Sequence, residues 1–246
     1  MTAWYVGVDL GASNIKAVVG RESGTVVSRA RRRTPRGPDG DAVVEAMVAA
    51  TREALDDAGV APEETVGCGV ASIGPLDKAA GELGRSANLG PNVDRVPLAE
   101  PLEDLLDTSV TVLNDANAGV VGERFYADRT PDDMAYLTIS SGIGAGVAVD
   151  GHVLSGWDGN AAEVGHYTVE IGGLTCGCGA EGHWEAYCSG TNIPRHARHV
   201  HETEGVPTEL PLGEIDAKDV FEATDDPLAE RVIERMQAFN AAGVAD

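Results

Sequence analysis

The stretch W-Y-V-G-V-D-L-G-A-S-N-I-K-A-V-V, residues 4–19, decides the expected fold. Its first apolar run ends in an acid, a turn of Gly, Ala, Ser and Asn follows at 11–14, and a second apolar run returns. Two apolar runs around such a turn predict an antiparallel hairpin. Residues 134–150 repeat the pattern about 130 positions later, around a glycine-rich turn at 140–146. The repeat indicates a duplicated β-hairpin.

Helical periodicity and further apolar runs extend the prediction along the chain. We expect strands at 25–31, 65–73 and 109–113, and helices at 41–58, 96–106, 118–126, 217–223 and 227–242. Asp41 and Gly59 are expected to cap the first of these helices. Residues 77–92 are expected to be loop and turn, and Pro194 to interrupt a partly helical stretch at 189–202. Because the chain closes on a helix without a returning strand, we expect it to be truncated.

Charge and composition exclude several classes of protein. The 246 residues carry a net charge of -22, yet 43% are hydrophobic, so the chain is expected to fold rather than to be disordered. A surface this acidic repels nucleic acids and anionic membranes, so we expect neither as a partner. It suits a salt-rich cytosol, where charges are screened. We therefore expect a halophile-like source, with an acidic protein from an ordinary cytosol as the alternative.

The cysteines and the hydropathy pattern indicate a cytoplasmic location. Four cysteines, Cys68, Cys176, Cys178 and Cys188, are too few and too clustered for a secreted disulfide framework. No apolar run is long enough to span a membrane, and no charged-then-apolar leader precedes the first strand. The expectation is a soluble protein of two lobes, each large enough to bury a core.

A candidate metal site lies in the stretch from residue 160 to residue 185. Two cysteines one residue apart have a histidine on each side, and the four candidate ligands are His166, Cys176, Cys178 and His183. Tetrahedral zinc accepts thiolate and imidazole, and four protein ligands leave no open position, which is typical of a structural site. The alternative is two free thiols and an ordinary surface histidine.

Two carboxylates, Glu163 and Glu185, lie among these candidate ligands. Beside thiolates they are poor zinc ligands. They are good acceptors for the hydroxyl groups of a sugar, so we expect a metal-braced loop that presents carboxylates to a polar substrate.

The two glycine turns are candidates for phosphate binding. A missing Cβ lets backbone N–H groups approach phosphates closely, and Ser13, Ser140 and Ser141 add hydroxyl donors. Neither turn matches the Walker A pattern G-x-x-x-x-G-K-[ST]. Two ordinary hairpin turns remain the alternative.

Two aspartates at predicted strand ends are candidates for catalysis. Asp115 follows Asn114 directly after the strand at 109–113, where a carboxylate can accept the proton of an attacking hydroxyl while Mg²⁺ neutralises the phosphoryl group. The alternative for Asp115 is helix capping. Asp9, beside the first turn, either holds Mg²⁺ through water or makes a turn hydrogen bond.

Taken together and in this order, the motifs resemble the ROK family of sugar kinases and repressors, within the actin-like, hexokinase-like group of ATPases. The matching segments are V-D-L-G-A-S-N-I-K at 8–16, A-N-L at 87–89, L-N-D-A-N-A-G-V-V-G-E at 113–123, I-S-S-G-I-G-A-G at 139–146, A-E-V-G-H at 162–166 and C-G-C-G-A-E-G-H-W-E at 176–185. The resemblance implies an α/β, two-lobed actin-like (ribonuclease H-like) fold with mixed sheets. Its lobes would be 1–115 and 116–246, the second one incomplete.

The resemblance also implies a role for each matching position. Asp115 would be the general base on the 6-hydroxyl of the sugar, and His166 would turn one ring nitrogen to zinc and the other to the sugar. The sugar would be bound by Asn88, Asn114, Asp115, Glu163, His166 and Glu185. ATP would be bound by Asp9, Gly11, Ser13, Asn14, Ser141, Gly142 and Gly144.

This chain departs from the family pattern at three places. His183 stands where the family has a cysteine ligand, and Ala12 and Ser13 replace the usual glycine and threonine of the first turn. Family members also continue into an L-G-G-type nucleotide segment and a closing helix that this sequence lacks.

The implied function is an ATP-dependent hexose kinase with glucokinase activity, using Mg²⁺ and a structural zinc ion and forming a homodimer. N-acetylhexosamine or fructose kinases of the same family and a non-catalytic sugar-binding regulator are the alternatives. The repressor branch carries a DNA-binding domain before the first phosphate motif, which here lies at 8–16, so we expect no such domain before it.

Overall fold

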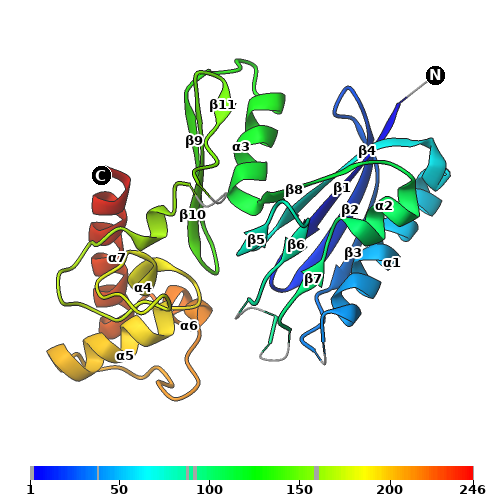
Figure 1. Cartoon of the computed structure of the whole chain (residues 1–246). Helices are drawn as coiled ribbons and strands as arrows, with labels where there is room; N and C mark the ends of the chain where they lie inside the picture. The colour runs from blue at the N-terminus through cyan, green and yellow to red at the C-terminus, as the bar shows by residue number, and fades with distance from the viewer. Residues whose placement is uncertain (1–2, 38, 87–88, 91–92, 158–160, 246) are drawn as a thin grey trace. The chain divides into compact units, whose positions relative to one another are not determined.

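The computed structural model describes residues 3–37, 39–86, 89–90, 93–157 and 161–245. The chain divides into two compact units, one made of 1–134 with 148–161 and the other of 135–147 with 162–246. Figure 1 labels the helices and strands of both units. The predicted lobe boundary after residue 115 differs from this division and stays a prediction about the lobes of the functional protein.

A five-stranded mixed sheet forms the centre of the first unit (Figure 1). Its order is β3-β2-β1-β4-β8, with bounds β1 (Trp4–Leu10), β2 (Asn14–Arg21), β3 (Val26–Arg33), β4 (Thr65–Ser72) and β8 (Val110–Asn114). β1 and β2 form the predicted hairpin, whereas β1, β4 and β8 run parallel. The register pairs Leu10 with Ser72 and Ser72 with Asn114, so the carboxyl ends of the three parallel strands meet at one edge. In α/β sheets this edge is where ligands bind.

Helices α1 (Asp41–Ala58) and α2 (Glu100–Leu106) cover one face of this sheet (Figure 1). Met47 and Leu55 of α1 pack into one apolar cluster with Val8 and other inward-facing strand residues. Gly59 ends α1 in the left-handed region, at φ 65°, as predicted. The predicted capping by Asp41 is wrong, because the N-cap position falls on Gly40 and Asp41 lies in the first turn.

A small three-stranded sheet occupies segments that the sequence left as loop or helix. It consists of β5 (Leu76–Asp77), β6 (Glu82–Leu83) and β7 (Val96–Pro97). In the chain these strands follow the short helix η1 (Pro62–Glu64) and β4, and they precede α2. The predicted helix at 96–106 therefore begins only at Glu100. Val96 and Leu83 pair across the sheet and are fully buried, so packing outweighs the helical pattern there.

Strands β9 (Met134–Ile139), β10 (Ile143–Val149) and β11 (His152–Val153) form a third sheet, in the order β11-β10-β9. The predicted second hairpin is present, but its turn covers 140–142 rather than 140–146. Ile143 and Ala145 are buried with the spacing of a strand, which explains why β10 starts early.

The second unit is mainly helical. Besides most of β9 and β10, it contains η2 (Val164–His166), α4 (Glu185–Cys188), α5 (Ile193–Glu204), α6 (Ala217–Glu222) and α7 (Pro227–Ala245). Helix α3 (Asp115–Tyr126) belongs to the first unit. Trp184 and Tyr187 are fully buried against Val232 and Met236 of α7. Pro194 does not interrupt a helix as predicted, because it lies in the first turn of α5, where no backbone N–H is needed. Within the described residues, none of the helices has both the length and the apolar character needed to cross a bilayer.

Candidate active site

The first glycine turn, residues 11–14, is closed by its own backbone. The Gly11 N–H donates to the Asn14 carbonyl at 3.0 Å, and the Thr34 hydroxyl donates to the Gly11 carbonyl at 2.7 Å. The Asn14 side chain accepts a hydrogen bond from Arg31 Nε at 3.0 Å. Ser13 is exposed at the tip. The turn is therefore a defined loop, held by β3 and the residue that follows it.

Asp9 forms an ion pair with Lys16, with 2.8 Å between Oδ2 and Nζ. The two residues are directly opposite each other in the β1–β2 register. They line a mainly apolar hollow of about 530 Å³ formed by the sheet and α3. Both side chains are about half exposed, so the pair contributes little to stability and leaves Asp9 accessible to a cation.

Asn114, and not Asp115, is the N-cap of α3. The Asn114 side-chain oxygen accepts from the N–H groups of Ala116 and Asn117 at 2.9 and 3.2 Å. Capping is a common role for asparagine just before a helix. This oxygen is therefore occupied, and Asn114 would offer a sugar its amide hydrogens. Asp115 itself accepts only a local bond from the Ala116 N–H, at 2.8 Å.

Asp115 has a raised pKa. Burial is the largest cause, and the negative charge of Asp9 adds to it, while the Ala116 N–H acts in the opposite direction. A carboxylate whose pKa lies above its ordinary value is a better proton acceptor. Asp115 stands at the carboxyl edge of the parallel strands, directly after β8, which is the position predicted for a general base.

The four predicted metal ligands are brought together in the second unit. One atom from each of His166, Cys176, Cys178 and His183 can be chosen so that all lie within 4.8 Å of one another. His166 Nδ1 lies 3.2 Å from His183 Nδ1 and 3.7 Å from Cys176 Sγ, and Cys178 Sγ lies 3.3 Å from His183 Nδ1. A tetrahedral zinc ion with bonds of about 2.0–2.3 Å holds its ligand atoms roughly 3.3–3.8 Å apart. The donor set fits such an ion, with histidine in the place of the fourth cysteine.

The geometry distinguishes the two ring nitrogens of His166. Nδ1 lies near His183 Nδ1 and Cys176 Sγ, whereas Nε2 lies 3.9 Å from Glu163 Oε2. His166 thus has one nitrogen beside the other candidate ligands and one beside a carboxylate, and its implied contacts with zinc and with a sugar stay predictions. A metal on Nδ1 would fix the ring orientation and keep Nε2 available to a hydroxyl.

The segment from His166 to His183, here called the metal loop, is folded back on itself. Bridges pair Thr168 with His183 and Thr175 with Glu181. Gly182 has φ 74°, and a Cβ there would collide with the Glu170 carbonyl, so only glycine fits before His183. Glu170 is in turn bound by Arg235 of α7 at 3.0 Å. These backbone and side-chain contacts therefore hold the loop in this shape without a bound ion.

The second phosphate turn contacts Glu185. Glu185 Oε2 accepts the Ile143 N–H at 2.8 Å, and the Ser140 N–H donates to the Gly142 carbonyl at 2.8 Å. Ser141 and Gly142 lie in the turn, whereas Gly144 lies inside β10. The predicted sugar ligand and the predicted phosphate turn are therefore neighbours within one unit.

The predicted residues fall into two groups. Asp9, Gly11, Ser13, Asn14, Asn114 and Asp115 lie in the first unit, and Ser141, Gly142, Gly144, Glu163, His166, Cys176, Cys178, His183 and Glu185 lie in the second. Asn88 lies outside the described residues. Each unit is compact in itself, and the shared cleft stays a prediction.

Two contacts of the site were not predicted from the sequence. The Asp9–Lys16 pair could have been found, because the turn at 11–14 places these residues opposite each other in the hairpin. The hydrogen bond from the Ile143 N–H could not be predicted, because every residue except proline has such a backbone donor. Its partner, Glu185, is 42 positions away.

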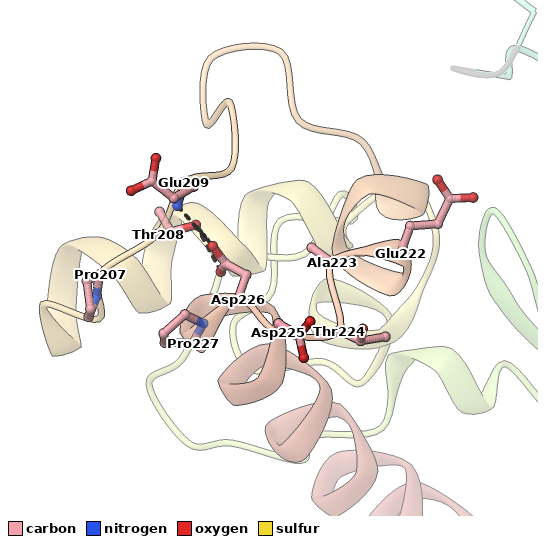
Figure 2. A pocket seen from close by; sticks show the side chains of 9 residues that line it. All are labelled: Pro207, Thr208, Glu209, Glu222, Ala223, Thr224, Asp225, Asp226 and Pro227. Carbon is pink, nitrogen blue, oxygen red and sulfur yellow. Dashed lines mark hydrogen bonds between the residues drawn. The ribbon is translucent and has the colours of Figure 1, made fainter.

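A separate hollow of 510 Å³ in the second unit lies between residues 207–209 and 222–227 (Figure 2). Asp226 accepts hydrogen bonds there from the Thr208 hydroxyl and from the N–H groups of Glu209, Leu228 and Ala229. Although burial acts to raise the pKa of Asp226, these bonds lower it overall. Asp226 therefore caps α7 and joins it to the loop before it.

Comparison with known proteins places these features in a family. The model of the ROK family matches residues 5–246. The chain is 36% identical to a glucokinase of Aeropyrum pernix over 99% of its own length and 77% of that protein. It is 39% identical to a glucokinase of Pyrobaculum calidifontis over 80% of its length, and there it spans only 61% of the relative.

A solved structure supports the same assignment. The ROK family glucokinase of Streptomyces griseus, in complex with glucose and AMPPNP, is 31% identical and aligns with a TM-score of 0.73. The alignment covers 99% of this chain and 78% of that one. The predicted actin-like α/β fold is thereby confirmed. The chain belongs to the ROK family.

Proposed function

We propose that the chain transfers the γ-phosphoryl group of ATP to the 6-hydroxyl of glucose. Relatives named glucokinase, at 36% and 39% identity, support this activity. The structural observation that carries it is Asp115. This carboxylate is not the N-cap of α3, accepts one bond from the Ala116 N–H, has a raised pKa and stands at the carboxyl edge of the parallel strands. Asp115 accepts the proton of the attacking hydroxyl as its oxygen forms a bond to the γ-phosphorus, while the bond from that phosphorus to the bridging oxygen breaks and ADP leaves.

The other predicted residues position the two substrates. Glu163, His166 Nε2 and Glu185 hold sugar hydroxyls, with Asn114 donating through its amide. The two glycine turns hold the phosphates through backbone N–H groups. Asp9, half-exposed beside the first turn, would hold Mg²⁺, which neutralises charge on the phosphoryl group.

The metal loop holds a structural zinc ion. Two thiolates and two imidazoles at the observed spacings suit zinc, and four protein ligands leave no position for a reacting group. The ion, when bound, supplies rigidity and fixes the tautomer of His166. Preference among hexoses and the expected homodimer stay predictions.

The proposal is tested by replacing Asp115 with asparagine. We expect turnover of glucose with ATP and Mg²⁺ in high KCl to fall roughly 10²–10⁴-fold, because general base catalysis contributes about this much. Asp115 is exposed, so the variant should keep close to the wild-type unfolding temperature, and a loss of turnover then reports on the reaction rather than on the fold.

The matched control is Asp128→Asn, an exposed aspartate just beyond α3, which should change neither property. Retention of most turnover by Asp115→Asn would exclude Asp115 as the base. A wild-type chain that binds glucose but transfers no phosphoryl group would favour the non-catalytic regulator instead.

A further inference from the structure

Both ends of helix α4 contact the second phosphate turn, residues 140–142. At the start of α4, Glu185 Oε2 accepts the Ile143 N–H at 2.8 Å. Just past its end, the Gly190 N–H donates to the Ser140 carbonyl at 2.7 Å, and the Thr191 N–H donates to the Ser141 carbonyl at 3.3 Å. The turn is thus held on two sides by one short segment.

The contact between Glu185 and the turn is close. A Cβ placed on Gly142 would lie only 2.9 Å from Glu185 Oε2, so the carboxylate rests directly against the turn. On the other side, a Cβ on Gly190 would lie 3.1 Å from the Ser140 carbonyl oxygen. Both sides of the turn therefore lie in van der Waals contact with the segment that contains α4.

Helix α4 is itself fixed from behind by α7. The indole N–H of Trp184 donates to Asn240 Oδ1 at 2.8 Å, and Cys188 Sγ donates to the Met236 carbonyl at 3.6 Å. Trp184 and Cys188 are buried in the core of the second unit. Because interiors are close-packed, the position of α4 is set by this core rather than by the turn.

The bond from Glu185 is not a helix cap. Glu185 is the first residue of α4, and its carboxylate bonds to a backbone group 42 positions earlier in the chain rather than to its own helix. An ionised carboxylate has about four acceptor sites. The bond to the Ile143 N–H uses one of them, and Glu185 is half-buried, so the group can still bind a hydroxyl.

We propose that Glu185 couples the two substrates. It binds a hexose hydroxyl and the Ile143 N–H with one carboxylate, so that a hexose orders the turn that receives the phosphate chain. This rests on the proposed function and assigns Glu185 a second role within it. By linkage, a phosphate chain bound at the turn strengthens hexose binding by the same factor.

The test is a set of calorimetric titrations on the chain with its metal. The dissociation constant of glucose is measured without and with saturating AMPPNP and Mg²⁺. We expect the wild-type chain to bind glucose roughly five-fold or more tightly when the nucleotide is present. In Glu185→Gln and in Gly142→Ala the ratio should fall close to one, because the shared carboxylate is weakened or displaced.

The matched control is Glu181→Gln. Glu181 is an exposed carboxylate in the metal loop, four positions before Glu185, and its removal should leave the ratio unchanged. Thermal unfolding of each variant verifies that the fold is retained.

Amide hydrogen exchange gives a readout that does not depend on turnover. Glucose alone should slow exchange of the Ile143 N–H in the wild-type chain and should not do so in Glu185→Gln. A wild-type chain that binds both ligands with a ratio of one overturns the coupling and leaves the proposed function standing. A wild-type chain that binds no hexose overturns the proposed function. If the Ile143 N–H exchanges at the wild-type rate in Glu185→Ala, the hydrogen bond between Glu185 and Ile143 is overturned as well.

Discussion

At the scale of single residues, the site depends on which of two neighbours caps a helix. Asn114 and Asp115 are both good N-cap residues, and the sequence alone left capping open as the role of Asp115. The structure assigns the cap to Asn114, with two hydrogen bonds from α3. Which residue becomes the N-cap depends on the exact residue at which β8 ends. Sequence patterns predict the ends of strands and helices only to within one or two residues.

His196 provides a test at the same scale. It is fully buried, with Nδ1 3.1 Å from the Tyr187 carbonyl. Burial, followed by the positive charge of Arg235, lowers its pKa to about 4; His199 acts in the same direction and Glu170 in the opposite one. As pH falls from about 6.5 to about 4, the unfolded chain gains a proton that the folded chain does not, so stability is lost over this window.

We therefore expect His196→Gln to flatten the pH dependence of unfolding. Between pH 7 and pH 4, the wild-type chain should lose about 3 kcal/mol more unfolding free energy than the variant does. Urea unfolding at several pH values measures it, with the exposed His152→Gln as control. Parallel pH profiles for His196→Gln and the wild-type chain would contradict a buried neutral imidazole.

At the scale of elements, the metal loop makes the sharpest prediction. Because an ion can bind this loop only in its folded form, binding free energy adds to folding free energy. We expect the purified chain to hold about one equivalent of zinc, and a chelator to lower the unfolding midpoint. Cys178→Ser should abolish zinc binding with little loss of packing, since Cys178 is exposed.

The control for this prediction is Cys68→Val, which changes a buried cysteine in the first unit and should keep the zinc. Metal analysis that finds far less than one equivalent in protein purified without added zinc would exclude the site. So would a chelator that leaves the unfolding midpoint unchanged.

Elements with a long, regular pattern were predicted well, and short ones were not. The hairpin β1–β2, helix α1 and helix α7 follow from apolar runs and helical periodicity, and the structure confirms them. The sheet of β5, β6 and β7 was missed, because strands of two residues have no period to detect. The second turn was predicted too long, since glycines at 144 and 146 lie inside β10 as strand residues.

At the scale of the whole molecule, the charge of -22 predicts a dependence on salt. Repulsion among surface carboxylates opposes the compact state, and at molar salt it is screened beyond about 3 Å. We expect the unfolding midpoint to rise between low and multimolar KCl. Sucrose at matched osmolality is the control, because it favours compact states without screening charge. A midpoint that responds equally to both would remove the electrostatic explanation.

The chain passes between its two compact units after residues 134, 147 and 161. No single cut therefore separates one unit from the other, since the strand segment 135–147 of the second unit interrupts the first. One contiguous stretch that carries the whole first unit, 1–161, also carries 135–147 of the second, and one that carries the whole second unit, 135–246, also carries 148–161 of the first. A recombination event between homologous genes that moves either unit whole therefore always moves part of the other unit with it.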